Sequence, residues 1–330
     1  MIGWSFHNFH PIVSSHLFLH RKDRIVKSRS KGILKEIKYV FLVVPTLTVW
    51  FTLNIFPQLG VYRLAFFKWN GFSKIQTFVG WQNFQTVFND PYTTRYISNT
   101  LLYILFLFTI QTFLAISFAL ILKRNTIPNR MFRTFFFLPM VFSSVMVGLT
   151  WGYMYDANLG ILNNLLVAAG NKGFAGFDWL GQPSRAVFFI VMVHIWANIG
   201  FPLTILTAGL HTIPETLYEA ATIDGATANQ SFWGITIPLL MPTLLRISLL
   251  TLTTGAMAFD YIQIFGASAS SDIRNPFDTI AVITYRTTQR ATNLGISAVY
   301  SVFLALILLV FFIAQYFAQK KAEENAGGGK

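Results

Sequence analysis

The sequence contains no cysteine, which excludes disulfide frameworks, thiolate metal sites and cysteine nucleophiles. Charge is also scarce: only 12% of the 330 residues are Asp, Glu, Lys or Arg, about half of the roughly 25% that is typical of soluble proteins. Hydrophobic residues make up 54% of the chain. A soluble protein with so little charge could not cover its own surface, so we expect lipid to be the solvent for most of this chain.

Several catalytic motifs are absent as well. There is no Walker A sequence, no His-Glu-x-x-His, no Gly-x-Ser-x-Gly and no pair of carboxylates inside an apolar span. We therefore expect neither an ATPase nor a membrane-embedded hydrolase, with no catalytic residues and no metal site. A net charge of +12 is typical of nucleic-acid-binding proteins. Here the basic residues lie between apolar segments, which indicates membrane topology, and no nucleic-acid partner is expected.

Long apolar segments dominate what is present. A bilayer crossing needs about 20 predominantly apolar residues, and six segments meet that requirement. They are 39–59, 97–122, 134–155, 186–210, 239–265 and 296–318. The second and the sixth contain no Asp, Glu, Lys or Arg. The sequence therefore predicts an all-α, multi-pass membrane protein with six transmembrane helices surrounded by membrane lipid.

The distribution of Lys and Arg predicts the orientation of these spans. If the N-terminus is cytoplasmic, 16 of the 25 basic residues fall on the cytoplasmic side and 9 on the other side. Basic residues favour the cytoplasmic side, so both termini are predicted to be cytoplasmic. Residues 1–38 are then a basic cytoplasmic extension, either a segment lying on the membrane face or a disordered basic tail. Residues 39–320 form the membrane domain, and 321–330 are predicted to be a flexible tail.

One cytoplasmic connection, 211–238, breaks the charge rule because it contains acidic residues and no Lys or Arg. Pro214 suits the first position of a helix, and Glu215 then falls in the first turn, where a carboxylate is favourable. Gly225 is a plausible C-terminal stop for this helix. A second short helix is expected to run through Phe232 to Pro238. Two short helices of this kind suit docking into a groove of a partner protein.

The residues of this connection resemble a known family. The run Leu-Tyr-Glu-Ala-Ala-Thr-Ile-Asp-Gly-Ala at 217–226, followed by Phe232, Ile235 and Ile237-Pro238, resembles the EAA loop of ABC-importer permeases. This form is typical of carbohydrate importers of the maltose and glycerol-3-phosphate type. The stretches 68–71 and 78–84 resemble the first of the two permease types that such importers pair. The similarity covers about 39–318, nearly the whole chain.

This resemblance implies a type I ABC importer permease fold in the bacterial inner membrane. It also implies four kinds of partner: a second permease in a heterodimer, two ATPase subunits, an extracytoplasmic solute-binding protein and a carbohydrate. The ATPase subunits would bind ATP and Mg, so the permease needs no cofactor of its own. Within the EAA loop, the resemblance implies that the contact with the ATPase is made by Glu219, Ala220, Ala221, Asp224 and Gly225.

Polar residues inside spans are costly and usually functional, and they predict the position of a sugar-binding site. The candidates are Ser144, His194, Asn198, Asp260 and Tyr261. His194 and Asn198 are four residues apart and share one helix face. Other roles stay open for each of them: Ser144 bonding its own backbone, His194 and Asn198 joining helices, and Asp260 serving structure or gating.

Other transport classes remain as alternatives. A secondary transporter or channel fits the sequence poorly, because no inverted repeat is detectable and the spans contain only one acidic residue. A permease for glycerol phosphate, amino acids or ions would share the EAA loop. The residues Asp224-Gly225-Ala226 and Trp69-Asn70-Gly71 favour a carbohydrate, and an oligosaccharide is the expected substrate.

Overall fold

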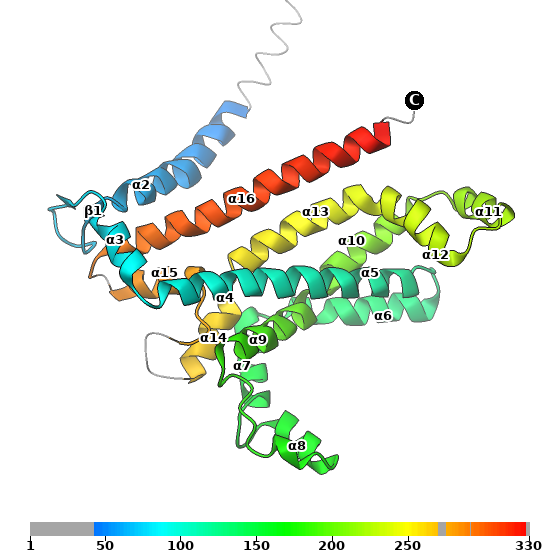
Figure 1. Cartoon of the computed structure of the whole chain (residues 1–330), viewed down its shortest axis with the longest axis horizontal. Helices are drawn as coiled ribbons and strands as arrows, with labels where there is room; N and C mark the ends of the chain where they lie inside the picture. Colours follow the sequence, from blue (N-terminus) through cyan, green and yellow to red (C-terminus); the bar gives the residue numbers. More distant parts are fainter. Residues whose placement is uncertain (1–42, 270–274, 291, 328–330) are drawn as a thin grey trace, which may run out of the picture. The chain divides into compact units, whose positions relative to one another are not determined.

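The computed structural model describes residues 43–269, 275–290 and 292–327 (Figure 1). The predicted extension 1–38 lies outside them. The chain divides into two compact units, Met1–Val61 and Tyr62–Lys330. In the first unit the chain is α-helical over 43–50 and continues through the π-helical turn η1, Phe51–Ile55. The helix α2, Phe56–Leu64, follows. The described part of the predicted first span, 39–59, is therefore helical.

The second unit is mostly helical. Its α-helices are α3 (Gln82–Asn89), α4 (Thr93–Phe106), α5 (Thr112–Ile121), α6 (Ile127–Phe137), α7 (Ser144–Met154), α8 (Ile161–Ala168), α9 (Pro183–Asn198), α10 (Gly200–His211), α11 (Glu215–Ile223), α12 (Ala228–Ser231), α13 (Ile237–Ala256), α14 (Asp260–Ala269), α15 (Ile280–Arg290) and α16 (Leu294–Gly327). Short π or 3-10 turns are η2 (Leu107–Gln111), η3 (Leu138–Val141), η4 (Lys172–Phe174) and η5 (Phe232–Thr236).

Within the described residues the only strands form a two-stranded hairpin. β1 (Phe67–Lys68) pairs antiparallel with β2 (Thr77–Phe78), and Phe67 lies opposite Phe78. The side chain of Asn83 holds this hairpin to α3 by donating to the backbone oxygens of Ala65 and Phe67 at 2.8 and 2.9 Å. The fold class is therefore helical, as predicted, with one small hairpin added.

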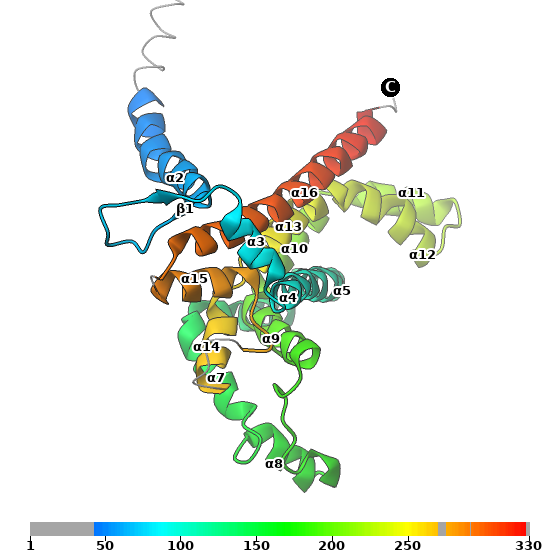
Figure 2. The same ribbon diagram turned by 60° about the vertical axis from the view of Figure 1, so that its left-hand side comes forward.

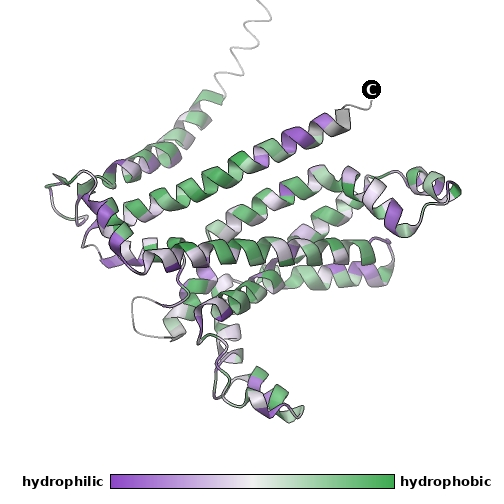
Figure 3. Cartoon of the chain, viewed as in Figure 1, coloured by the Kyte–Doolittle hydropathy of each residue, from purple (hydrophilic) through white to green (hydrophobic). Residues whose placement is uncertain are grey.

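In the part of the chain that the structure describes, three helical stretches are long and apolar enough to cross a membrane by themselves: Thr93–Ile121, Ala228–Ala267 and Leu294–Ala322. They coincide with the second, fifth and sixth predicted spans. Figure 3 shows apolar residues along most of α16, in keeping with a lipid-facing helix. This helix extends through Gly327 and so includes residues 321–327, for which the sequence predicted a flexible tail.

The third and fourth predicted spans, 134–155 and 186–210, are not single straight helices. The first corresponds to Ile127–Val141 and Ser144–Met154, bent by 96°, and the second to Pro183–Asn198 and Gly200–His211, bent by 55°. At the first bend, Ser143 has an extended backbone and its side chain accepts a hydrogen bond from the Val145 N–H, so a new helix begins there. Counting each bent pair as one span raises the number from three to five among the described residues.

At the second bend, the two helices α6 and α10 pack closely. A Cβ atom added at Gly200 would lie only 2.5 Å from the Cα of Phe137, so α10 can approach the end of α6 only because residue 200 is glycine.

The buried core lies where α4 and α5 pack on α9 and α10, and its fully buried members include Tyr103, Leu107 and Leu203. Figure 2 shows α7 beside α14, and these two helices are in contact.

A buried ion pair joins the segment after α14 to α15. The Arg286 guanidinium lies 2.8 Å from the Asp278 carboxylate, and the side chains are 10% and 0% exposed. Arg286 also donates to Gln263, and the Asn275 N–H donates to Asp278. Asn99 of α4 donates to the backbone oxygen of Asp278 at 2.9 Å. Burial raises the pKa of Asp278 to about 6, although the Arg286 charge and the Asn275 hydrogen bond act in the opposite direction.

Candidate functional site

The predicted coupling loop contains a well-formed helix, α11. Pro214 is its N-cap residue, one position earlier than expected, and Glu215 opens the first turn as predicted. Asp224 is the C-cap, and Gly225 has a φ of 79°. The N–H groups of Gly225 and Ala226 donate to Thr222 and Ala221, which is the Schellman pattern of a helix stop. A side chain at residue 225 would strain this left-handed backbone, so the predicted role of Gly225 as the stop is confirmed.

The second helix of the loop differs from its prediction. α12 begins at Ala228 behind a capping box, in which Thr227 and Gln230 bond reciprocally. It continues through η5 directly into α13, and Pro238 lies in the first turn of α13. The prediction that Pro238 ends a short helix is wrong, because the helical stretch Ala228–Ala267 continues through it.

Tyr218 fixes α11 to the rest of the protein. Its hydroxyl forms a 2.9 Å hydrogen bond with the Thr236 hydroxyl, which lies at the end of η5. The Lys123 ammonium lies 4.5 Å from the centre of the Tyr218 ring, within cation–π range. No residue of α11 is buried, and this anchor leaves the opposite side of the helix open to solvent.

The open side of α11 has a mixed character. Glu219 and Ala220 are exposed, Leu217 is exposed as well, and Ile223 is 86% exposed. Ala221 is half-buried, on the same side of the helix as Tyr218. Of the residues predicted for the coupling contact, Glu219 and Ala220 therefore lie on the open face, and Ala221 lies toward the anchor. We call the set Leu217, Glu219, Ala220 and Ile223 the α11 outer face.

The second candidate site lies between α4, α9 and α14. The Tyr103 hydroxyl is 2.9 Å from Nδ1 of His194, and the Asn198 amide donates to the His194 backbone oxygen at 3.0 Å. Asn198 also reaches the Tyr261 hydroxyl at 3.4 Å, and the His194 and Tyr261 rings are 5.3 Å apart. The structure therefore brings three predicted residues together and adds Tyr103. Tyr261 is only 8% exposed, so its ring faces cannot stack on a sugar without rearrangement.

A cavity of 220 Å³ opens beside this cluster. It is lined by residues of η2, η3, α9, α10 and α13: Gln111, Met140, His194, Asn198, Phe201, Pro202, Ile247, Leu250, Thr251 and Thr254. Gln111 is buried, and its Oε1 atom has no hydrogen-bond partner among the described residues. Gln111 was not among the residues predicted from the sequence, although a glutamine near the middle of the second span is a signal for a functional site.

Ser144 and Asp260 meet beside this cluster, since Asp260 directly precedes Tyr261 in the chain. The Ser144 hydroxyl donates to the Asp260 carboxylate at 2.8 Å, which links the beginning of α7 to the beginning of α14. Neither residue lines the cavity of 220 Å³. Asp260 lies in the first turn of α14, where a carboxylate is favourable next to the helix dipole. This arrangement favours the structural or gating alternative for Asp260.

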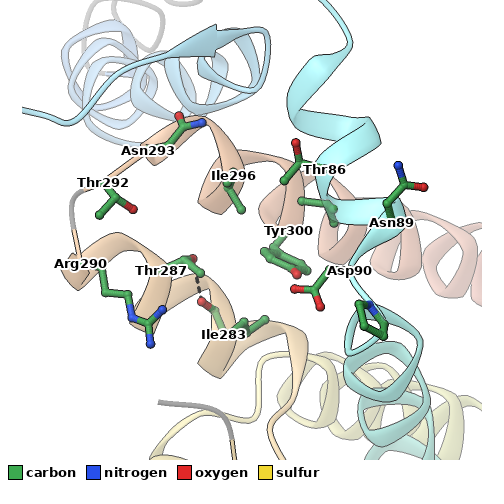
Figure 4. A pocket seen from close by; sticks show the side chains of 12 residues that line it. Thr86, Asn89, Asp90, Ile283, Thr287, Arg290, Thr292, Asn293, Ile296 and Tyr300 are labelled. Atoms are coloured by element: carbon green, nitrogen blue, oxygen red, sulfur yellow. Dashed lines mark hydrogen bonds between the residues drawn. The ribbon is translucent and has the colours of Figure 1, made fainter. Parts of the chain in front are cut away.

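A larger pocket of 440 Å³ contains none of the predicted residues (Figure 4). It lies between α3, α15 and the beginning of α16, and it is lined by Thr86, Val87, Asn89, Asp90, Pro91, Ile283, Thr287, Arg290, Thr292, Asn293, Ile296 and Tyr300. One of the lining residues, Tyr300, forms a hydrogen bond of 3.1 Å with the Thr93 hydroxyl.

Comparisons with known proteins agree with this fold. Residues 111–323 match the family model described as "Binding-protein-dependent transport system inner membrane component". A probable ABC transporter permease of Bacillus subtilis is 30% identical over 87% of this chain and 96% of its own length. A trehalose/maltose transport system permease of Thermococcus litoralis is 29% identical over 86% of this chain and 94% of its own length.

The fold has also been seen in a solved structure. One chain of a bacterial alginate ABC transporter, crystallised with an alginate pentasaccharide-bound periplasmic protein, superposes with a TM-score of 0.72. It is 23% identical, with 90% of this chain and 98% of that chain covered. The resemblance to ABC-importer permeases is thus confirmed. The chain belongs to the family of binding-protein-dependent transport system inner membrane components, and it is a multi-pass membrane permease of an ABC transporter.

Proposed function

We propose that this chain is one permease subunit of an ATP-driven carbohydrate importer and forms half of the translocation path beside a second, different permease. The names of its relatives support a sugar, because one is a trehalose/maltose permease and the similar fold belongs to an alginate transporter. Both of these transporters are named for saccharides of two or more units, which supports an oligosaccharide. A solute-binding protein delivers the sugar from outside the bacterial inner membrane.

The observation that carries this proposal is the α11 outer face. An exposed isoleucine and leucine beside a carboxylate are costly to leave in water, and they suit a groove on a partner. The Tyr218 anchor and the Gly225 stop hold the face in one orientation, so a push on α11 is transmitted to α13 through Thr236. We assign this face to the contact with one of two ATPase subunits, which bind ATP and Mg.

The residues around the cavity of 220 Å³ are assigned to the sugar. Gln111 Oε1 is an acceptor without a partner among the described residues, and a sugar hydroxyl would satisfy it. His194 and Asn198 line the same cavity, and Phe201 adds an aromatic wall. The groups that face the cavity are held in place by their neighbours outside it, which are Tyr103, Tyr261 and the Ser144–Asp260 pair. Six spans and two cytoplasmic termini complete the proposal.

The function is tested with the complete complex of both permeases, two ATPase subunits and the binding protein in lipid vesicles. Maltose, trehalose and alginate oligosaccharides are compared with glycerol phosphate and an amino acid mixture as stimulators of ATP hydrolysis. We expect stimulation and uptake only with saccharides. Stimulation by glycerol phosphate or by amino acids alone would contradict the carbohydrate assignment, and uptake without ATP would contradict an ATP-driven importer.

The sugar contact gives a more local prediction. Replacing Gln111 with Met conserves most of its volume and removes the acceptor, so sugar affinity should fall by a factor of about 2–13, the equivalent of one hydrogen bond. Assembly should not change, because the lost group has no described partner in the protein. Thr109→Val is the matched control in the same span, since the Thr109 hydroxyl bonds only its own helix. Equal affinity in Gln111→Met and Thr109→Val would remove Gln111 from the site.

A further inference from the structure

A pocket of 550 Å³ lies between α6 and α10, at the end of the protein predicted to be cytoplasmic. The described residues that line it all come from these two helices: Arg130, Arg133, Thr134, Phe137, Thr204, Thr207, Ala208 and His211. None of the candidate residues of the sugar site or the α11 outer face belongs to it. Its chemistry is therefore separate from the function proposed above.

The lining of this pocket is cationic. Arg130, Arg133, Thr134 and Phe137 follow the spacing that places side chains on one helix face, so both guanidinium groups are directed to the same side of α6. His211 adds a third basic group from α10. No Asp or Glu is among the described residues that line the pocket. An anion is the ligand that this lining favours.

The available hydrogen-bond donors narrow the choice of anion. The hydroxyl groups of Thr134, Thr204 and Thr207 already donate to backbone oxygens one turn earlier, at 2.8–3.0 Å. Among the described residues, Arg133 makes only a long hydrogen bond of 3.4 Å, to Asn125. Donation to a ligand therefore falls to the two guanidinium groups, whose planar fork matches the oxygens of a phosphate.

The opposite side of α6 indicates where such a phosphate comes from. Met131, Phe132 and Phe135 are exposed there, and Phe137 is an exposed aromatic ring at the pocket itself. A helix with exposed apolar residues on one face and arginines on the other is typical of the membrane interface. Basic pockets between membrane helices on the cytoplasmic side bind acidic lipid head groups.

We propose that this pocket binds the head-group phosphate of an anionic phospholipid from the cytoplasmic leaflet. The proposal rests on the cytoplasmic orientation given under the proposed function. Arg130 and Arg133 bind the phosphate, and His211 contributes from α10. The bound lipid bridges α6 and α10, which meet closely at Phe137 and Gly200.

The test measures lipid binding to the purified complex in detergent, by native mass spectrometry and by the rise in unfolding temperature. Phosphatidylglycerol, phosphatidylcholine and inorganic phosphate are titrated separately. We expect phosphatidylglycerol to bind and stabilise the wild type, and the other two to have little effect. The double variant Arg130→Gln/Arg133→Gln should bind phosphatidylglycerol about tenfold or more weakly, since two charge-assisted hydrogen bonds are lost.

The control is Arg124→Gln/Lys320→Gln, which changes the net charge equally at exposed positions outside the pocket. It should bind phosphatidylglycerol like the wild type. Equal loss in both double variants would mean a general charge effect, and unchanged binding in both would mean that the lipid binds elsewhere. Phosphate binding as tight as that of phosphatidylglycerol would replace the lipid with a free anion. Each of these three results overturns the proposal. All of the readouts are independent of transport, so they stand even if the imported solute is not a sugar.

Discussion

Replacing Ile223 with Asp should abolish sugar-stimulated ATP hydrolysis while the permease itself still folds. The side chain is 86% exposed, so it contributes little to the fold, and the substitution leaves the Tyr218–Thr236 anchor and the Gly225 stop in place. In the proposed complex the same side chain is buried against an ATPase subunit. A carboxylate there would lose its hydration without gaining a partner, which costs several kcal/mol at a desolvated interface.

The measurements are copurification of the ATPase subunits and coupled hydrolysis in vesicles. Ile75→Asp is the matched control, because Ile75 is equally apolar and 75% exposed but lies in the β1–β2 connection. Glu219→Lys should give the same loss as Ile223→Asp, by charge reversal on the α11 outer face. Normal assembly and coupling in both α11 variants would show that this face is not the docking surface.

Replacing Arg286 with Gln should destabilise the protein by about 3–5 kcal/mol, the cost of leaving one buried charge without its partner. Asp278 is fully buried and depends on the Arg286 guanidinium at 2.8 Å. The Arg290→Gln control lies one turn later on α15 and is exposed, so its unfolding temperature in detergent should stay near that of the wild type. Adding Asp278→Asn to Arg286→Gln should recover part of the loss, because both buried groups are then neutral.

This variant should also depend on pH in a defined direction. Burial raises the pKa of Asp278 to about 6, above the 3.8 of an unperturbed carboxyl, so the folded state retains a proton that the unfolded state releases. The neutral Asp278 carboxyl therefore stabilises the folded state at low pH, and this stabilisation is lost as the pH rises through about 6. Arg286→Gln should consequently be less damaging at pH 5 than at pH 8. An equal loss at both values would contradict the ionised pair.

Much of the fold could be predicted because its signals are local. Apolar runs located the second, fifth and sixth spans. Glu215 and Gly225 marked the two ends of α11 to within a residue, because a first-turn carboxylate and a left-handed glycine act on the nearest turn of backbone. The EAA loop also indicated the family of the chain, and the comparisons confirm that family. Pairs four residues apart, such as His194 and Asn198, were correctly placed on one face.

Other features have no local signal. The break before Ser144 depends on how the Ser143 side chain caps the next helix, and hydropathy averaged over a span does not detect such a change of direction. The burial of Tyr261 excluded it as an open stacking surface, and the Ser144–Asp260 bond joins residues 116 positions apart. The sequence predicted all three residues as sugar contacts, and only the packing shows which protein groups each of them meets.

The sequence by itself determined three things: that this protein is a membrane protein, which segments form its apolar helices, and that it contains the loop of an importer permease. These follow from hydropathy and from short motifs, which are properties of neighbouring residues. Only the tertiary structure decided which side chains meet. It brings Tyr218 to Thr236 and pairs Asp278 with Arg286. It also places Gln111 in the lining of a cavity, and it gathers Arg130, Arg133 and His211 around one pocket. Each of these depends on which helices pack together, because a side chain in a span has as many possible partners as there are helices beside it.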